Sequence, residues 1–139
     1  MENDNAAEKL VKKALSARDS AYAPYSGFRV GAALMTSGGE IYTGCNIENA
    51  SYGLTCCAER VAVFKAVSEG KKDFTAIAVA CDSGDFCSPC GACRQVLAEF
   101  GGSIKVYMCN QKGEYKVKTV SELLPGFFSL TSAEWGHTK

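Results

Sequence analysis

The sequence predicts an α/β domain in which helices cover both faces of a mixed five-stranded sheet. The main observation is that segments with apolar residues at helical spacing alternate with short strand-like segments, in the order α-β-β-α-β-α-β-β-α. The second observation is length, because 139 residues are enough to bury a core without disulfide bonds. No repeat, low-complexity segment or long linker divides the chain, so we expect residues 1–139 to form a single domain.

The first part of the chain is predicted to be a helix followed by a hairpin. Apolar residues recur at helical spacing over 4–21, with lysines and an arginine between them, which predicts an amphipathic helix. Pro24 lies just after it, and proline disfavours a helical conformation in the residue before it. Strands are expected at 28–35 and 40–45, joined by turn residues. The first of them contains Gly31 and two alanines, which allow a neighbouring element to approach closely.

The rest of the chain alternates between helices and strands. Residues 46–55 lack periodicity and are rich in Asn, Ser and Gly, which indicates a loop that builds a site. A helix is expected at 57–68, with Gly70 just beyond its end. The nearly continuous apolar run at 74–81 predicts a strand buried on both faces. The remaining elements are a helix at 90–100, strands at 104–109 and 115–117, and a helical turn at 119–124.

Charge and hydropathy exclude several classes of function. Fifteen basic and fifteen acidic side chains cancel, and no basic block is present that would follow a phosphate backbone, so a nucleic-acid polymer is not expected as a partner. No apolar run approaches the roughly 18 residues that a membrane helix needs. The acidic, polar residues 1–5 lack the features of a secretory or transit signal. We therefore expect a cytoplasmic protein that does not contact membranes.

Cysteine is unusually frequent, with eight residues in the chain. A disulfide framework fits small secreted proteins better than a chain of this kind. Cys45, Cys81 and Cys109 lie in apolar strand-like segments and are expected to be small core residues. The motifs Cys57-Ala58-Glu59-Arg60 and Pro89-Cys90-Gly91-Ala92-Cys93-Arg94 differ from these, because both fall at the start of a predicted helix.

These two motifs contain the chemistry of a zinc hydrolase. Cys90 and Cys93 are three residues apart and lie on one face of a helical turn, and Cys57 supplies a third sulfur. Helix N-termini stabilise thiolates through their free N–H groups and the helix dipole. Three sulfur ligands leave one position of a tetrahedral zinc open for water, and Glu59 is a carboxylate beside it.

The residues alone leave a second arrangement open. Cys87 could be a fourth ligand, which would close the site and make it a purely structural zinc module. Against this, Cys87 precedes the helix start, and Glu59 would be left beside a thiolate cluster without a function. The only histidine, His137, lies near the end of the chain and is expected to be solvated, so the acid and base must be a carboxylate. Three thiolates also call for a nearby cation, for which Arg60 is favoured over Arg94.

The motifs C-A-E and P-C-x-x-C resemble those of the zinc-dependent nucleoside and nucleotide deaminases. The resemblance covers nearly the whole chain and is strongest to the small homotetrameric cytidine deaminases. The segments that carry it, besides the two motifs, are Ala23–Leu34, Gly44–Ala50, Cys93–Val96 and Glu122–Pro125.

The resemblance implies a three-layer α/β/α cytidine-deaminase-like fold and a reaction of pyrimidine salvage. Cytidine and 2′-deoxycytidine would be hydrolysed to uridine and 2′-deoxyuridine with release of ammonia. One Zn²⁺ per chain would be held by Cys57, Cys90 and Cys93, and the zinc-bound hydroxide would attack C4 of the pyrimidine. Glu59 would take the proton from the water, deliver it to N3, and later help the amine leave as ammonia. Arg60 would form hydrogen bonds with the zinc thiolates.

The resemblance also implies roles in substrate binding. Asn46 and Glu48 would hold the sugar hydroxyls, and their spacing of two residues puts both side chains on one side of an extended segment. Phe28 would stack on the pyrimidine. In the family, neighbouring subunits complete each site of a homotetramer, and Tyr52 and Phe128 are the matching positions here. Phe127 is the alternative to Phe128, because the two phenylalanines are adjacent.

Two further activities are weighed beside this one. A deaminase that acts on cytosines in RNA would need a basic path or a line of stacking aromatic residues, which the balanced charge does not offer. A deaminase of a nucleoside antibiotic fits less well with Asn46 and Glu48 as sugar-binding residues.

Overall fold

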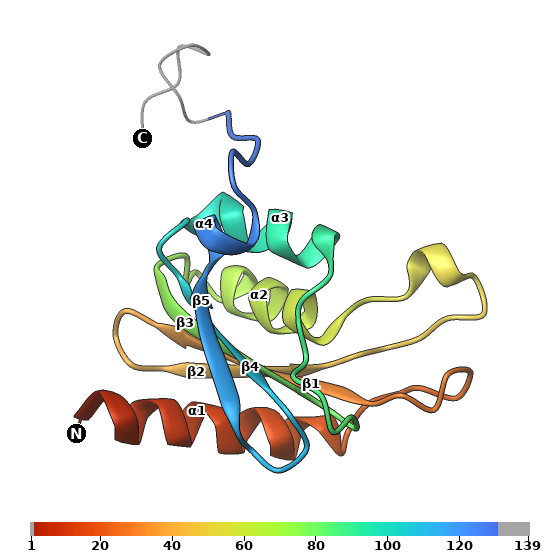
Figure 1. Cartoon of the computed structure of the whole chain (residues 1–139). Helices are drawn as coiled ribbons and strands as arrows, with labels where there is room; N and C mark the ends of the chain where they lie inside the picture. The colour runs from red at the N-terminus through yellow and green to blue at the C-terminus, as the bar shows by residue number, and fades with distance from the viewer. Residues whose placement is uncertain (1, 131–139) are drawn as a thin grey trace.

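A five-stranded mixed sheet lies at the centre of the computed structural model, which describes residues 2–130 (Figure 1). The strands are β1 (Val30–Thr36), β2 (Ile41–Cys45), β3 (Phe74–Cys81), β4 (Lys105–Cys109) and β5 (Tyr115–Thr119). Their spatial order is β2-β1-β3-β4-β5. β1 pairs antiparallel with β2 and β3, β3 is parallel to β4, and β4 is antiparallel to β5. The predicted mixed sheet is therefore confirmed.

Helices cover both faces of the sheet, which gives the three layers expected from the sequence. One long helix lies against one face, and two shorter helices lie side by side against the other (Figure 1). The helices are α1 (Glu2–Arg18), α2 (Ala58–Ser68), α3 (Gly91–Phe100), the short α4 (Val120–Leu123) and a 3₁₀ turn, η1 (Tyr52–Leu54). Within residues 2–130, no helix has the length and apolar character needed to cross a membrane.

The central strand β3 is buried on both faces, as its apolar run predicts. Successive side chains of a strand point to opposite faces, so β3 contributes to two separate clusters. Ala76 and Ala78 pack under α1 together with Leu10, while Ile77 packs under α2 and α3 together with Leu97. The small alanines on the α1 side leave room for the bulkier residues of that helix.

Two glycines allow helices to lie very close to the sheet. A Cβ atom on Gly31 would lie 2.1 Å from the carbonyl oxygen of Ala14 in α1. A Cβ atom on Gly44 would lie 2.5 Å from the carbonyl oxygen of Ala58, at the start of α2. Neither distance is possible for a real side chain, so both positions require glycine for the observed packing.

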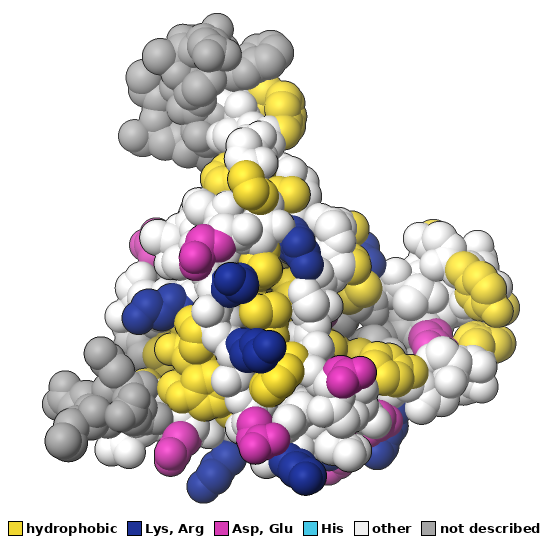
Figure 2. Space-filling model, in the orientation of Figure 1, with side chains coloured by type: hydrophobic (Ala, Val, Ile, Leu, Met, Phe, Trp, Pro, Cys, Tyr) yellow, Lys and Arg dark blue, Asp and Glu magenta, His cyan; other side chains and the backbone are white. Residues whose placement is uncertain are grey.

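Two loops extend beyond the sheet at one end of the molecule (Figure 1), one between α1 and β1 and one between β2 and α2. We call them the projecting loops, residues 19–29 and 46–57. Backbone hydrogen bonds join them, from Tyr22 N–H to Asn46 O (2.9 Å) and from Glu48 N–H to Tyr22 O (2.8 Å). Figure 2 shows hydrophobic side chains on the part of the second loop that contains η1.

Lysine side chains accompany both edges of the sheet. On β2, the carbonyl oxygen of Thr43 accepts a hydrogen bond of 2.6 Å from the Lys65 ammonium of α2. On β5, Lys116 and Lys118 are exposed, and the Lys116 ammonium lies 4.8 Å from the centre of the Phe86 ring. In Figure 2, basic side chains lie over the part of the molecule where β5 runs.

The boundaries of several elements differ from the expectation. The first helix ends at Arg18, because the next residues form a turn in which Asp19 N–H bonds to Ser16 O. The strand expected from Phe28 begins only at Val30, and β5 continues to Thr119. The third helix, expected from residue 90, begins at Gly91, since Cys90 is its N-cap residue and Pro89 lies before the cap.

Candidate metal and substrate site

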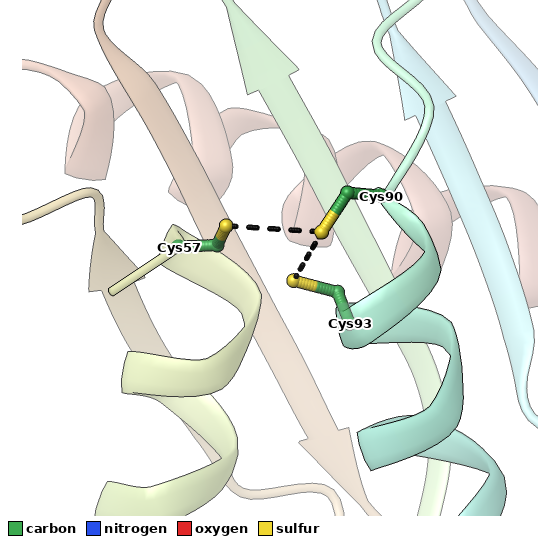
Figure 3. Close-up of side chains that lie close together, drawn as sticks. All are labelled: Cys57, Cys90 and Cys93. Carbon is green, nitrogen blue, oxygen red and sulfur yellow. Dashed lines mark hydrogen bonds between the residues drawn. The ribbon is translucent and has the colours of Figure 1, made fainter. Parts of the chain in front are cut away.

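Three sulfur atoms converge where the N-termini of α2 and α3 meet (Figure 3). The Sγ atom of Cys90 lies 3.9 Å from that of Cys57 and 3.5 Å from that of Cys93, and all three lie within 4.8 Å of one another. A tetrahedral zinc with bonds of about 2.3 Å to sulfur separates its sulfur ligands by about 3.8 Å. The cluster therefore fits a zinc ion with only small adjustments.

The two helices position these sulfurs for a reason that is visible in the sequence. Cys57 is the N-cap residue of α2 and Cys90 is the N-cap residue of α3, and Cys93 follows in the first turn of α3. Neither N-cap side chain caps the backbone N–H groups of its own helix, and both sulfurs are directed at the gap between the helices. The positive ends of two helix dipoles meet at this point and stabilise negative sulfur.

The Glu59 carboxyl group lies in the first turn of α2 and is almost fully buried, with 4% of the residue exposed. Burial in a low-dielectric environment disfavours the charged form and raises the pKa of Glu59 to about 7. The nearby Cys57 thiolate acts in the same direction, whereas a hydrogen bond with Cys93 opposes it. The structure thus brings a proton-carrying carboxyl group next to the three sulfurs.

The cation expected beside the thiolates is Arg60 and not Arg94. Arg60 Nη2 lies 3.5 Å from Cys57 Sγ and also donates to the carbonyl oxygen of Thr55 at 3.3 Å. Hydrogen bonds with Cys93 and Arg60 lower the pKa of Cys57 to about 5. Arg94 instead donates to the carbonyl oxygens of Pro89 (2.8 Å) and Leu123 (2.7 Å), so it fixes the loop before α3 and the end of α4.

Cys87 does not belong to the cluster. Among the described residues, the group of potential ligand atoms contains only Cys57, Cys90 and Cys93. Burial, followed by a hydrogen bond with Cys81, raises the pKa of the Cys87 thiol, which favours the protonated form. The backbone N–H of Cys87 donates to Cys109 O at 2.9 Å. The geometry therefore supports the open three-sulfur site over the closed four-cysteine module.

The residues expected to bind the substrate lie on the projecting loops. The Phe28 ring is exposed and precedes β1, so it is not the core strand residue that its pattern alone indicates. Asn46 is buried, and its side-chain amide is engaged with the backbone, donating to Phe28 O (2.9 Å) and accepting from Val30 N–H (2.8 Å). Glu48 accepts hydrogen bonds from Tyr25 N–H (3.0 Å) and Ser26 N–H (3.1 Å).

The two aromatic residues expected to reach a neighbouring site are both strongly exposed. Tyr52 in η1 is 76% exposed, and its ring meets that of Tyr25 edge to face with the centroids 6.4 Å apart. Phe128 is 63% exposed, and its carbonyl oxygen accepts a hydrogen bond from Gln95 Nε2 at 3.0 Å. His137 lies outside the described residues.

The sequence interpretation missed Ser26 as a site residue. Its hydroxyl donates to Glu48 and accepts from Phe28 N–H, and it lines a cleft of about 410 Å³. The other residues of this cleft are Tyr25, Glu48, Tyr52 and Thr55. No local pattern marks Ser26, because a single serine after Pro-Tyr is ordinary turn chemistry.

Comparison with known proteins supports the same chemistry. The family model described as the cytidine and deoxycytidylate deaminase zinc-binding region matches residues 4–110. A cytidine deaminase of Sporosarcina psychrophila is 57% identical over 88% of this chain and 90% of its own length. A cytidine deaminase of Halalkalibacterium halodurans is 56% identical over 88% of this chain and 93% of its own length. The crystal structure of a cytidine deaminase from Burkholderia pseudomallei superimposes with a TM-score of 0.84 at 48% identity, covering 86% of this chain and 97% of that one.

The fold and the cluster of three sulfurs, together with these matches, define a zinc-dependent hydrolytic enzyme. More specifically, the chain belongs to the cytidine and deoxycytidylate deaminase family. All eight cysteines are free, so the three thiols of the cluster are available for a metal.

Proposed function

We propose that this chain hydrolyses cytidine and 2′-deoxycytidine to uridine and 2′-deoxyuridine, with release of ammonia. The observation that carries the proposal is the convergence of Cys57, Cys90 and Cys93 next to the buried carboxyl group of Glu59. The cytidine deaminases of S. psychrophila and H. halodurans share more than half of the aligned residues with this chain.

The reaction requires water to be activated and two protons to be moved. The three thiolates would hold a zinc ion, which would supply a Lewis acid that makes water a nucleophile near neutral pH. Glu59 would take one proton from the attacking water and deliver it to N3 of the pyrimidine as the water oxygen attacks C4. It would then take the second proton from the oxygen now on C4 and deliver it to the amine, which leaves as ammonia. A carboxyl group with a pKa of about 7 can both accept and release a proton at neutral pH.

Arg60 serves this chemistry through the charge of the site. Three thiolates and one Zn²⁺ together have a net charge of −1, which opposes the loss of a proton from water. The guanidinium of Arg60, 3.5 Å from Cys57 Sγ, withdraws negative charge from that sulfur. We assign it this role because the second candidate, Arg94, bonds to backbone carbonyls instead.

The substrate is proposed to bind between the cluster and the projecting loops. Phe28 presents an exposed ring for stacking on the pyrimidine. We assign Asn46 and Glu48 to the sugar hydroxyls. Glu48 and Thr55 line the same cleft. The carbonyl oxygen of Thr55 accepts a hydrogen bond from Arg60, which also contacts Cys57, so the Arg60 side chain connects the cleft with the cluster. A nucleoside with an intact sugar fits this arrangement better than a substrate without one.

We further propose a homotetramer in which neighbouring subunits complete each site. The projecting loops and the C-terminal segment expose large apolar side chains, including Tyr52, Leu54 and Phe128. Clusters of exposed apolar side chains are typical of surfaces that contact another protein. Tyr52 and Phe128 are therefore assigned to the site of an adjacent chain.

We place the protein in the cytoplasm and treat residues 1–139 as one domain. The first assignment rests on the free cysteines, because three of them must remain reduced to bind zinc and a reducing compartment keeps them so. The second rests on the central sheet, against which segments from both ends of the described chain pack.

The proposal is tested by incubating the zinc-loaded protein with cytidine and recording its ultraviolet spectrum. We expect loss of cytidine absorbance, release of ammonia in equal amount, and one zinc per chain. Full zinc occupancy without turnover would contradict the proposed substrate.

A further inference from the structure

The carboxylate of Glu48 is already largely engaged before any substrate binds. Its Oε1 atom accepts hydrogen bonds from the backbone N–H groups of Tyr25 (3.0 Å) and Ser26 (3.1 Å). Its Oε2 atom accepts one from the hydroxyl of Ser26. A carboxylate has about four acceptor positions, so about one position, on Oε2, is left for a ligand.

The hydroxyl of Ser26 can donate in only one direction. Its oxygen accepts a hydrogen bond of 3.0 Å from the backbone N–H of Phe28, which can only donate. The carboxylate of Glu48 can only accept, so the single proton of the hydroxyl is donated to Glu48. This bond is the main reason why the pKa of Glu48 is lowered, so the carboxylate stays ionised.

The surrounding backbone gives Ser26 a fixed position. The carbonyl oxygen of Phe28 accepts a hydrogen bond of 2.9 Å from Asn46 Nδ2, so Phe28 is held on one side by Ser26 and on the other by Asn46. Ser26 and Glu48 both line the cleft of about 410 Å³ between the projecting loops. The pair thus forms part of the cleft wall.

We propose that Ser26 is a positioning residue that acts on the substrate through Glu48. By occupying one acceptor position of Oε2, its hydroxyl determines which position remains for a sugar hydroxyl and keeps the carboxylate from rotating. The inference rests on the proposed function, in which Glu48 binds the sugar. Ser26 itself neither touches the reacting atoms nor carries a proton.

The first test is the kinetics of the Ser26→Ala enzyme with cytidine. We expect KM to rise roughly tenfold, as for the loss of one hydrogen bond to a charged group, while kcat changes less than about threefold. Ser26→Thr keeps the hydroxyl and should restore KM to within about threefold of the original enzyme. The matched control is Ser16→Ala on the exposed surface of α1, which should leave both constants unchanged.

The decisive test is a double-mutant cycle with Glu48→Ala, which removes the acceptor of the Ser26 hydrogen bond. If Ser26 acts through Glu48, adding Ser26→Ala to Glu48→Ala should raise KM by no more than about twofold further. The role of Ser26 would be overturned if the increases in KM from the two substitutions multiplied in the double variant. It would also be overturned if Ser26→Thr failed to restore KM. Absence of cytidine turnover by the zinc-loaded original enzyme would instead refute the proposed function, so the two failures are distinguishable.

Discussion

At the scale of single residues, the site depends on a carboxyl group that is kept away from bulk water. Glu59 lies in the first turn of α2 beside the sulfurs, and little of it is exposed. Such a position makes the group a poor permanent anion and a good proton carrier. Its removal should therefore affect the chemistry and leave the metal in place.

Replacing Glu59 by glutamine should lower kcat by about a hundredfold to ten-thousandfold, the usual contribution of a general acid and base. Glutamine has a similar shape but cannot transfer the proton, so zinc should stay at one ion per chain. Steady-state kinetics and metal analysis on the same preparation check both expectations. Retention of most of the activity would refute Glu59 as the proton carrier.

The cysteines allow an equally sharp comparison. Cys90→Ser removes one of the three sulfurs of the cluster and should release most of the zinc. Cys87→Ser should retain the zinc, because the Cys87 thiol lies outside the cluster and forms a hydrogen bond with Cys81. Metal content after dialysis against a mild chelator measures the difference. Zinc loss in Cys87→Ser would favour the closed four-cysteine module.

Spacing along the chain predicted that Cys90 and Cys93 lie on one helical turn and that Glu59 follows Cys57 at the start of another. It left Cys87 open as a fourth ligand, and only the folded chain places Cys87 outside the cluster. Spacing could not predict Ser26 or the engaged state of the Asn46 amide. Both depend on the contact between the two projecting loops, which are far apart in sequence and meet only in the folded chain.

At the scale of elements, the position of α2 is set by the sheet beneath it. Gly44 on β2 lets the helix start lie in contact with the strand, and the same helix start carries Cys57 and Glu59. A side chain at position 44 would displace the start of α2, and Cys57 would move with it.

Gly44→Ala should therefore reduce the free energy of unfolding by about 1–3 kcal/mol, the usual cost of overpacking, and should weaken zinc binding. Urea unfolding and competition with a zinc chelator measure the two effects. Gly84→Ala is the matched control, because a Cβ atom there has no neighbour within 4 Å. Equal effects in the two variants would show that the contact with α2 is not the cause.

The sequence predicted the type and order of the helices and strands correctly, because each has a clear apolar period. It did not predict η1, which is a single 3₁₀ turn and too short to show a period. It also started the third helix at residue 90, although Cys90 is the N-cap residue and α3 begins at Gly91. Such boundaries depend on capping geometry, which residue types indicate only approximately.

At the scale of the whole molecule, the exposed apolar residues of the projecting loops suggest that one chain is not the functional unit. A tetramer would have four times the chain mass of 14.8 kDa, which sedimentation can measure. The order of strands in the sheet was not predictable either, because the pairing of β1 with both β2 and β3 depends on contacts across the whole chain.

Mixing two inactive variants tests whether neighbouring chains share a site. Glu59→Gln and Tyr52→Ala should each have little activity alone, and co-refolded chains should recover a measurable part of it. Recovery is expected because some sites then combine an intact Glu59 from one chain with an intact Tyr52 from another. A stable active monomer, or no recovery in a mixed tetramer, would show that each chain completes its own site.

The lysines at the sheet edges have a consequence for the behaviour of the protein at high concentration. A bare strand edge is a template on which further chains can polymerise without limit. Here an ammonium group covers a carbonyl of β2, and Lys116 and Lys118 bring positive charge to any strand that approaches β5. These lysines therefore disfavour edge-to-edge polymerisation of the sheet. Contacts between copies are then expected at the projecting loops.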